Sequence, residues 1–181
     1  VIGTEGYNNY LKVIDPDGKR RDFFQSLANE VDRGDITNKE FLRLVAHHTG
    51  DTVEHITKEL FEKVTINRPL VAYIQELKRI YKIGLLSNYT YEWMEALLEK
   101  HNLYPLFDAV FISSRHRIIK PDAAAFEKAL HLTGVKPEEA IFVDDRHIHV
   151  DAANRLGLTG ILYTSVAQLK KDIKSIGVET V

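Results

Sequence analysis

Five polar residues of the sequence follow apolar runs and could together hold a phosphate group and a divalent cation. Ser87 and Asn88 come directly after one run, Asp144 and Asp145 come directly after another, and Lys120 lies in the segment that follows a third. A hydroxyl and an ammonium group can bind phosphate oxygens, and a carboxylate pair offers the hard oxygen ligands that Mg²⁺ prefers. The sequence therefore predicts a site for a phosphorylated ligand and magnesium.

Each of these residues also has a simpler structural explanation. Ser87 could cap the helix that follows it, because serine is common at helix N-termini. Lys120 could be a solvated loop residue. Asp144 and Asp145 are harder to explain in this way, because adjacent carboxylates repel each other unless something compensates their charge. The occurrence of all three groups in one chain favours the site.

The elements that would position these residues alternate along the sequence after Pro69. Helical periodicity predicts helices over 70–81, 92–101, 123–132, 149–156 and 166–176, and short apolar runs predict strands over 83–86, 109–112, 141–143 and 160–163. Parallel strands need crossover helices, so the alternation predicts an α/β fold with a parallel sheet covered on both faces. Ligands bind at the carboxyl ends of such strands, where Ser87, Asp144 and Asp145 are expected.

The sequence before Pro69 predicts a small helical bundle. Apolar residues recur there at helical spacing in three short segments. Thr37 with Glu40 three residues later is typical of a helix N-terminus, and the segment Gly50-Asp51-Thr52 indicates the end of one helix and the start of the next. This bundle interrupts an otherwise regular α/β pattern.

Length, charge and cysteine content narrow the class of protein. A chain of 181 residues can bury one core with a modest insertion. Its 24 basic and 26 acidic residues nearly cancel, which gives no electrostatic reason to expect nucleic acid or anionic membrane as a partner. The chain has no cysteine, so disulfides and cysteine nucleophiles are excluded. We find neither a membrane-spanning run nor a signal peptide, so the expected location is cytoplasmic.

Three ordered segments of the sequence resemble motifs two, three and four of the haloacid dehalogenase-like (HAD) hydrolase superfamily: Gly84-Leu85-Leu86-Ser87-Asn88, Lys120-Pro121-Asp122 and Val143-Asp144-Asp145. The segment 33–41 is similar to the helical cap that many members carry between their first two motifs. The resemblance implies a Rossmann-like parallel sheet covered by helices, with an inserted helical cap at residues 5–68. The HAD-like core would comprise residues 69–181 together with 1–4.

The resemblance also implies a role for each of the five residues. Ser87 would hydrogen-bond a phosphoryl oxygen, and Asn88 would shape the loop around the substrate. Lys120 would be catalytic, since it would neutralise phosphate charge and keep the nucleophile ionised. Asp144 and Asp145 would anchor Mg²⁺. The implied function is magnesium-dependent hydrolysis of a small phosphorylated metabolite through an aspartyl-phosphate intermediate.

The nucleophilic aspartate of the family is expected just upstream of Val1, because Val1-Ile2 resembles the tail of the first motif. Asp15 and Asp17 cannot replace it, since Asp15-Pro16-Asp17-Gly18 is a turn signal within the cap. The 181 residues alone are therefore expected to be inactive. The strand before the nucleophile is normally central, so without it the strands at 83–86 and 141–143 would lie about two strand spacings apart, roughly 9–10 Å.

Histidines and tyrosines near the motifs allow further predictions. His149 stands where the family often has an asparagine, and with His147 and Asp151 it could suggest a transition-metal site. Alternate residues diverge on a helix, so we expect these side chains to lie beside the main site or in solvent instead. Four tyrosines near the expected cleft could touch the substrate: Tyr7, Tyr10, Tyr89 and Tyr91.

Two other functions remain open. The chain could be a truncated or degenerate relative that binds without catalysis. It could also be a 2-haloacid dehalogenase-type hydrolase, although Asp144-Asp145 argues against this, because that branch resembles a serine-containing fourth motif and needs no metal. A bacterial receiver domain also combines an acidic pair, a hydroxyl and a lysine, but its acidic pair comes first in the chain and here it comes last.

Overall fold

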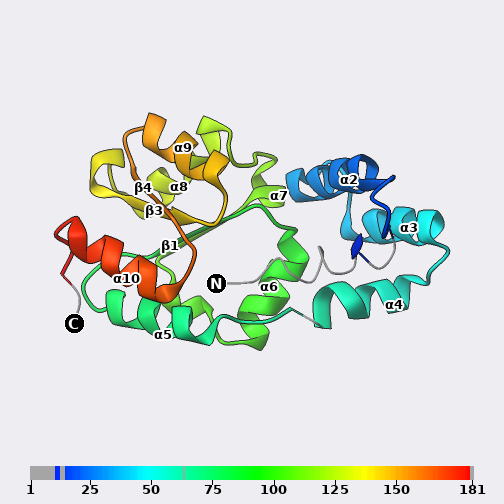
Figure 1. Cartoon of the computed structure of the whole chain (residues 1–181), viewed down its shortest axis with the longest axis horizontal. Coiled ribbons are helices and arrows are strands. Elements are labelled where there is room, and N and C mark those ends of the chain that lie inside the picture. The colour runs from blue at the N-terminus through cyan, green and yellow to red at the C-terminus, as the bar shows by residue number, and fades with distance from the viewer. Residues whose placement is uncertain (1–10, 13–14, 63, 180–181) are drawn as a thin grey trace.

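The computed structural model describes residues 11–12, 15–62 and 64–179. In Figure 1, helices α2, α3 and α4 lie at one end of the molecule, and the strands with their surrounding helices lie at the other. We call the first region the cap and the second the core. Val1, Tyr7 and Tyr10 lie outside the described residues.

The cap is a bundle of short helices, as the sequence predicts. Its apolar faces meet in one cluster, in which Phe24, Phe41, Val45 and Ile56 are at most 2% exposed. Burial of each such side chain contributes about 1.5–3 kcal/mol, so this cluster is the main source of the stability of the cap. The elements are α2 (Arg21–Arg33), α3 (Asn38–Thr49), α4 (Val53–Thr57) and the π-helical turn η1 (Lys58–Glu62).

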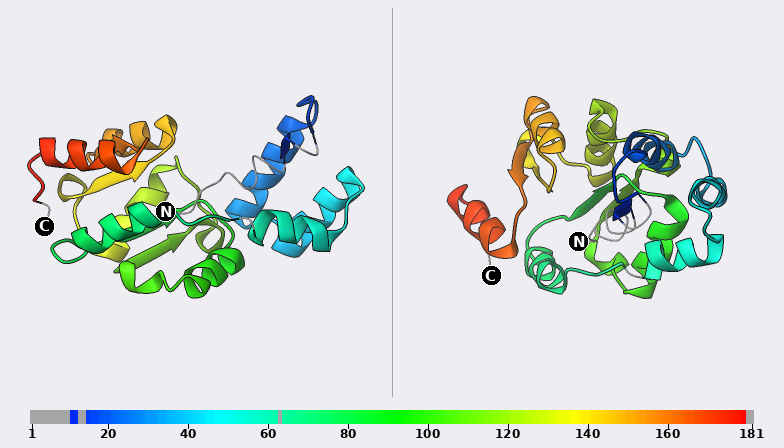
Figure 2. Two further views of the ribbon diagram at one scale, coloured as in Figure 1. Left: turned by 60° about the horizontal axis from the view of Figure 1, so that its bottom comes forward. Right: turned by 45° about the vertical axis from the view of Figure 1, so that its right-hand side comes forward.

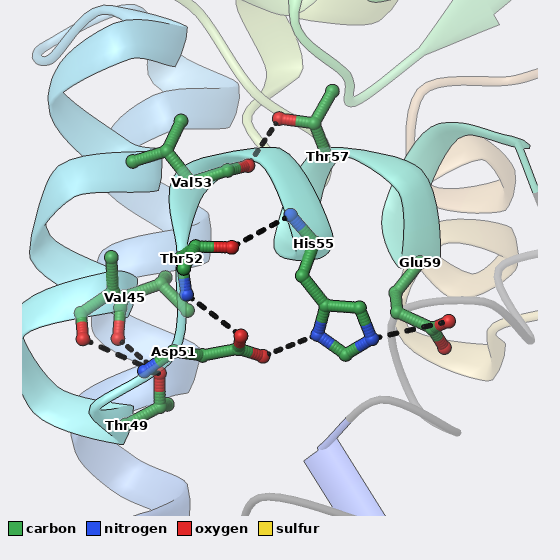
Figure 3. A network of polar contacts seen from close by, with 9 residues as sticks. Val45, Thr49, Asp51, Thr52, Val53, His55, Thr57 and Glu59 are labelled. Carbon is green, nitrogen blue, oxygen red and sulfur yellow. Dashed lines mark hydrogen bonds and ion pairs between the residues drawn. The ribbon is translucent and has the colours of Figure 1, made fainter.

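Local hydrogen bonds fix the ends of the cap helices. The hydroxyl of Thr37 accepts from the backbone N–H three residues later at 3.2 Å, which confirms the predicted start of α3. The helix ends at Gly50, whose φ of 72° glycine adopts easily. Thr52 then starts α4 by accepting from the backbone of His55 at 3.1 Å, and the His55 ring lies 2.7 Å from the Asp51 carboxylate (Figure 3).

The core follows the predicted alternation of helices and strands. One helix, α7, is not predicted, because four residues are too few for a periodic pattern. Helix α5 also ends four residues before the expected position, since the chain turns after Leu77. The elements are α5 (Arg68–Leu77), β1 (Gly84–Ser87), α6 (Tyr91–Lys100), η2 (Tyr104–Leu106), β2 (Ala109–Ile112), α7 (Ser113–His116), α8 (Ala123–Thr133), η3 (Pro137–Glu139), β3 (Ile141–Asp144), α9 (His147–Arg155), β4 (Thr159–Leu162) and α10 (Val166–Ser175).

The four strands form two parallel pairs. In one pair Ser87 of β1 lies opposite Ile112 of β2, and in the other Asp144 of β3 lies opposite Leu162 of β4. The parallel arrangement is confirmed. Among the described residues β1 and β3 are not hydrogen-bonded to each other, and no described strand lies between them, where the central strand was expected.

Helices pack on both strand pairs and cover the apolar runs in part, since Val143 of β3 remains 37% exposed. Helix α8 packs on β1 and β2, and α9 packs on β3 and β4, while α5 and α10 lie side by side (Figure 2). The rings of Phe126 and Phe142 meet edge to face at 5.1 Å between α8 and β3. Among the described residues, no helix has the length and apolar character that crossing a bilayer requires.

The cap meets the core at the C-terminal end of α2. The hydroxyl of Ser113 in α7 donates to the backbone carbonyl of Asp32 at 2.5 Å, and Arg117 forms an ion pair with Asp35 at 3.0 Å. Gly34 also lies close to the core, because a Cβ atom there would lie 2.4 Å from the carbonyl oxygen of Ser114. The division of the chain at residue 68 stays a prediction.

Candidate active site

Lys120 is buried between the carboxyl ends of β1 and β3. It is 8% exposed, and its Nζ donates to the carbonyl oxygen of Leu86 at 2.9 Å and to Oδ2 of Asp144 at 2.6 Å. Lysine is almost never buried without a partner, so these bonds explain its position. They contradict the alternative that Lys120 is a solvated loop residue, and they bring the second, third and fourth motifs to one edge of the strands.

Asn88 holds the backbone of Lys120 with two hydrogen bonds. Its Oδ1 accepts from the Lys120 N–H at 2.8 Å, and its Nδ2 donates to the Lys120 carbonyl at 2.9 Å. The amide side chain therefore fixes the loop that carries the lysine. Ser87 lies between Asn88 and the carbonyl that Lys120 contacts, as the last residue of β1. Because α6 has Thr90 at its N-cap, Ser87 does not cap that helix, and the simpler explanation for this serine is wrong.

Asp144 is a buried carboxylate with several hydrogen-bond donors. Besides Lys120, Nδ1 of His149 lies 3.0 Å from its Oδ1, and the backbone N–H of Arg146 donates to the same oxygen at 2.9 Å. Burial alone would raise the pKa of Asp144, but the contacts with His149, Lys120 and Arg146 together hold that pKa well below its usual value. The carboxylate is therefore ionised at neutral pH.

The predicted separation of the histidines is found. His149 is 3% exposed and bonds Asp144, whereas His147 and Asp151 are exposed. The three side chains thus do not converge. His149 orients the Asp144 carboxylate, a positioning role that matches the expected location beside the main site.

Asp144 and Asp145 differ in their surroundings. Asp145 is exposed, while Asp144 already accepts three hydrogen bonds. Carboxylate oxygens are the donors that Mg²⁺ prefers, and this ion commonly takes one or two carboxylates with water and substrate phosphate. Asp144 and Asp145 offer oxygens of this kind. Within the part of the chain that the structure describes, no group of three or more His, Cys, Asp or Glu side chains could hold a metal by itself.

Asp32 of the cap is a further candidate that sequence reasoning missed. Burial raises the pKa of its carboxyl to about 7, and the positive charge of Arg146 opposes this rise. Burial and the charge of Asp32 in turn raise the pKa of Tyr89 to about 12. A carboxyl from α2 thus lies close enough to interact with residues that follow Ser87 and Asp145. Its place at the edge of the apolar face of α2, one residue after Val31, is the signal that could have found it.

Ser113 is the second residue that the sequence analysis missed. It is 0% exposed, and its hydroxyl accepts from the Tyr89 N–H at 2.9 Å while donating to Asp32. One hydroxyl therefore ties the cap to the loop after β1. A lone serine at a strand end carries no sequence signal for this role.

Comparison with protein families gives a match over most of the chain. Residues 14–157 match the family model described as haloacid dehalogenase-like hydrolase. Over 154 residues the chain is 27% identical to drimenol cyclase drtB of Aspergillus calidoustus, covering 81% of this chain and 29% of that protein. Over 85 residues it is 34% identical to pyrophosphatase PpaX of Bacillus cereus, covering 46% of this chain and 39% of that protein. The chain thus spans less than half the length of these two relatives.

Solved structures share the fold. A HAD family enzyme of Bacteroides thetaiotaomicron superposes with a TM-score of 0.78 at 19% identity, covering 94% of this chain and 92% of that one. The same enzyme has been crystallised with magnesium and inorganic phosphate. At this level of identity the likeness establishes the α/β fold with its helical cap.

Proposed function

The chain is a member of the haloacid dehalogenase-like hydrolase family, and we propose that it acts as a magnesium-dependent phosphohydrolase on a small phosphorylated metabolite. The observation that carries the proposal is the buried contact of Lys120 with Asp144 beside Ser87, at one edge of two parallel strand pairs. Relatives named pyrophosphatases support a phosphate-bearing substrate.

In this proposal Ser87 and Lys120 bind the phosphoryl group. The Ser87 hydroxyl donates to a phosphoryl oxygen, and the Lys120 ammonium offsets phosphate charge. The Leu86 carbonyl holds this ammonium at the strand ends, while Asn88 fixes the backbone of Lys120. A buried, pre-positioned donor stabilises developing charge better than a mobile one, because it needs no reorganisation during the reaction.

Asp144 and Asp145 would hold Mg²⁺, with Asp144 oriented by His149. When bound, the ion supplies positive charge that offsets the charge of the phosphate and of the carboxylates. The ionised state of Asp144, which its low pKa maintains, suits this role. The arrangement resembles the common pattern in which ligand side chains are fixed by neighbouring hydrogen bonds.

The nucleophile in this proposal is an aspartate that precedes Val1 in the full protein. Its carboxylate oxygen attacks phosphorus, the bond to the leaving oxygen breaks, and the leaving group takes up a proton. Water then hydrolyses the aspartyl-phosphate to release inorganic phosphate. Among the described residues the carboxylate that contacts Lys120 is that of Asp144, whose oxygens already accept other hydrogen bonds, which favours a separate nucleophile.

The test is hydrolysis of p-nitrophenyl phosphate by the full-length protein. We expect activity with Mg²⁺, loss of activity with EDTA, and recovery on adding Mg²⁺ back. Ser87→Ala is expected to lower kcat/KM about 100-fold, as removal of one oxyanion donor does. The matched control is Ser175→Ala on the exposed end of α10, which should leave kcat/KM unchanged.

Two results would contradict the proposal. One is hydrolysis that EDTA does not affect, and the other is a Ser87→Ala variant with the kcat/KM of the unchanged protein. Rapid quenching should also trap phosphate on the protein in a form that hydroxylamine releases, as expected of an acyl phosphate. Turnover without such a species would exclude the covalent intermediate.

A further inference from the structure

A cavity of about 260 Å³ lies between the cap and the core. Asn38 lines it from the cap, and Thr90, Glu92, Ser114 and Arg115 line it from the core. None of the five candidate active-site residues, all of which the structure describes, lines this cavity. Its volume holds several waters or one small metabolite, and it is smaller than the pockets that enclose drug-sized ligands.

Two side-chain atoms in the cavity wall are buried without a hydrogen-bond partner among the described residues. They are Oγ1 of Thr90 and Oδ1 of Asn38. Thr90 is 3% exposed, and although it stands at the N-cap of α6, its hydroxyl does not accept the usual capping hydrogen bond. Leaving a buried polar group unpaired costs about 1–3 kcal/mol, so a bound molecule that completes its bonding would explain it.

The wall combines hydrogen-bond acceptors with one positive charge. Glu92 accepts from Nδ2 of Asn38 at 3.0 Å, which leaves the Asn38 oxygen and the carboxylate charge available to a donor. The guanidinium of Arg115 lies 4.8 Å from the ring centroid of Tyr91 and 3.3 Å from its hydroxyl. Arg115 forms no ion pair with a described carboxylate, so its charge can receive an anionic group.

We propose that this cavity binds a small zwitterionic amino acid. Its ammonium group, which has three donors and no acceptor, would be bound by Asn38, Thr90 and Glu92. Its carboxylate would pair with Arg115, as guanidinium groups commonly do. A neutral polyol offers Arg115 no anionic group, and inorganic phosphate would face the Glu92 carboxylate, so a zwitterion matches the charges of the wall best.

The bound amino acid would stabilise the docked position of the cap, because it contacts Asn38 on one side of the cavity and Thr90 on the other. The proposal is independent of the phosphohydrolase function, since the cavity and its residues are separate from Ser87 and Lys120. Its test accordingly uses binding and thermal unfolding, and needs no measurement of hydrolysis.

The first experiment measures the Tm of the purified protein with 10 mM glycine, L-alanine or L-serine. Ethanolamine, propionate and glycerol at the same concentration serve as probes that lack one or both charges. We expect at least one amino acid to raise Tm by about 2–4 °C and the other three compounds to raise it by less than half as much. No rise with any amino acid, or an equal rise with one of the three comparison compounds, would overturn the proposal.

The second experiment uses variants of the wall. Thr90→Val keeps the shape but removes the unpaired hydroxyl, so Tm without ligand should stay equal or rise, and the amino-acid shift should disappear. Arg115→Gln should weaken the affinity measured by calorimetry at least tenfold, while Arg155→Gln at the exposed end of α9 should not change it. If both wall variants keep full affinity for the amino acid, the proposed site is refuted. If Thr90→Val does not fold, the affinity of Arg115→Gln alone decides whether the site exists.

Discussion

The Nζ of Lys120 lies 2.6 Å from Oδ2 of Asp144, and each side chain is 8% exposed. Breaking a buried ion pair of this kind lowers the free energy of unfolding more than breaking an exposed salt bridge does. Removing one partner leaves the other charge buried without compensation, which destabilises a protein by about 3–5 kcal/mol. An exposed pair contributes about 0–1 kcal/mol.

Lys120→Met should therefore lower the free energy of unfolding by about 3–5 kcal/mol, because Asp144 loses its cationic partner. The measurement is urea denaturation at pH 7. The control is Lys19→Met, which removes a lysine that pairs with Asp17 at 2.7 Å while 81% exposed, and should change stability by less than about 1 kcal/mol. Equal effects of the two substitutions would mean that Asp144 does not depend on Lys120.

Asp32→Asn should stabilise the protein more at high pH than at low pH. The pKa of Asp32 is about 7 in the folded protein against 3.8 for the ordinary group, so between these values the unfolded chain releases a proton that the folded protein keeps. Stability from this residue is therefore present at low pH and is lost as pH rises towards 7. At pH 8 the substitution Asp32→Asn should raise the free energy of unfolding by at most about 4 kcal/mol, and by less where solvent reaches the carboxyl.

The measurement for Asp32 is the difference in Tm between the variant and the unchanged protein at pH 4.5 and pH 8. Asp22→Asn, an exposed position on the same helix, should change stability by less than about 0.5 kcal/mol at either pH. If Asp32→Asn changes Tm by the same amount at both pH values, a raised pKa for this carboxyl is excluded.

Ser113→Ala should destabilise the protein by about 1–3 kcal/mol, because it leaves the Tyr89 N–H and the Asp32 carbonyl unpaired in a buried place. Amide hydrogen exchange at Tyr89 should become faster in the same variant, since its hydrogen bond is lost. Ser175→Ala, on an exposed helix end, should cost less than about 0.5 kcal/mol. Unchanged exchange at Tyr89 would contradict the contact.

Gly34→Ala should be more harmful than Gly50→Ala, although both glycines have a positive φ. Gly34 has φ of 79° and Gly50 has φ of 72°, so the left-handed backbone destabilises alanine by a similar amount, about 1–2 kcal/mol, at each position. Only at Gly34 would the added methyl meet backbone, with the carbonyl oxygen of Ser114 at 2.4 Å; nothing lies within 4 Å at Gly50. We expect Tm to fall at least twice as far for Gly34→Ala, and similar losses would argue against close contact of cap and core.

Much of the core could be predicted because its strands are short apolar runs. The strand predicted at 109–112 coincides with β2, and the other three strands differ by a residue or so at their ends. Helix α7 could not be predicted, since two serines and two charged or polar residues show no periodicity. Its conformation depends instead on packing against α2.

Some features of the candidate site could likewise be predicted from the sequence, and others could not. Convergence of Lys120 and Asp144 follows from the order of strands and loops, so the sequence was sufficient to predict it. The clamp of Asn88 on the Lys120 backbone depends on the exact course of two loops, and the raised pKa of Asp32 depends on burial between cap and core. The place of Asp32 beside Val31 marks it as a candidate in the sequence. Local sequence specifies neither the course of the two loops nor the size of the shift in the pKa of Asp32.

The attachment of one ammonium group to β1 through a carbonyl and to β3 through a carboxylate has a practical consequence. Protons on a buried, hydrogen-bonded amine exchange slowly with solvent, so the ¹⁵N resonance of this side chain should be observable when most lysine amines are not. Its chemical shift would then change if either of these two contacts changed, so that single signal could be used to test the proposed binding of phosphate and magnesium.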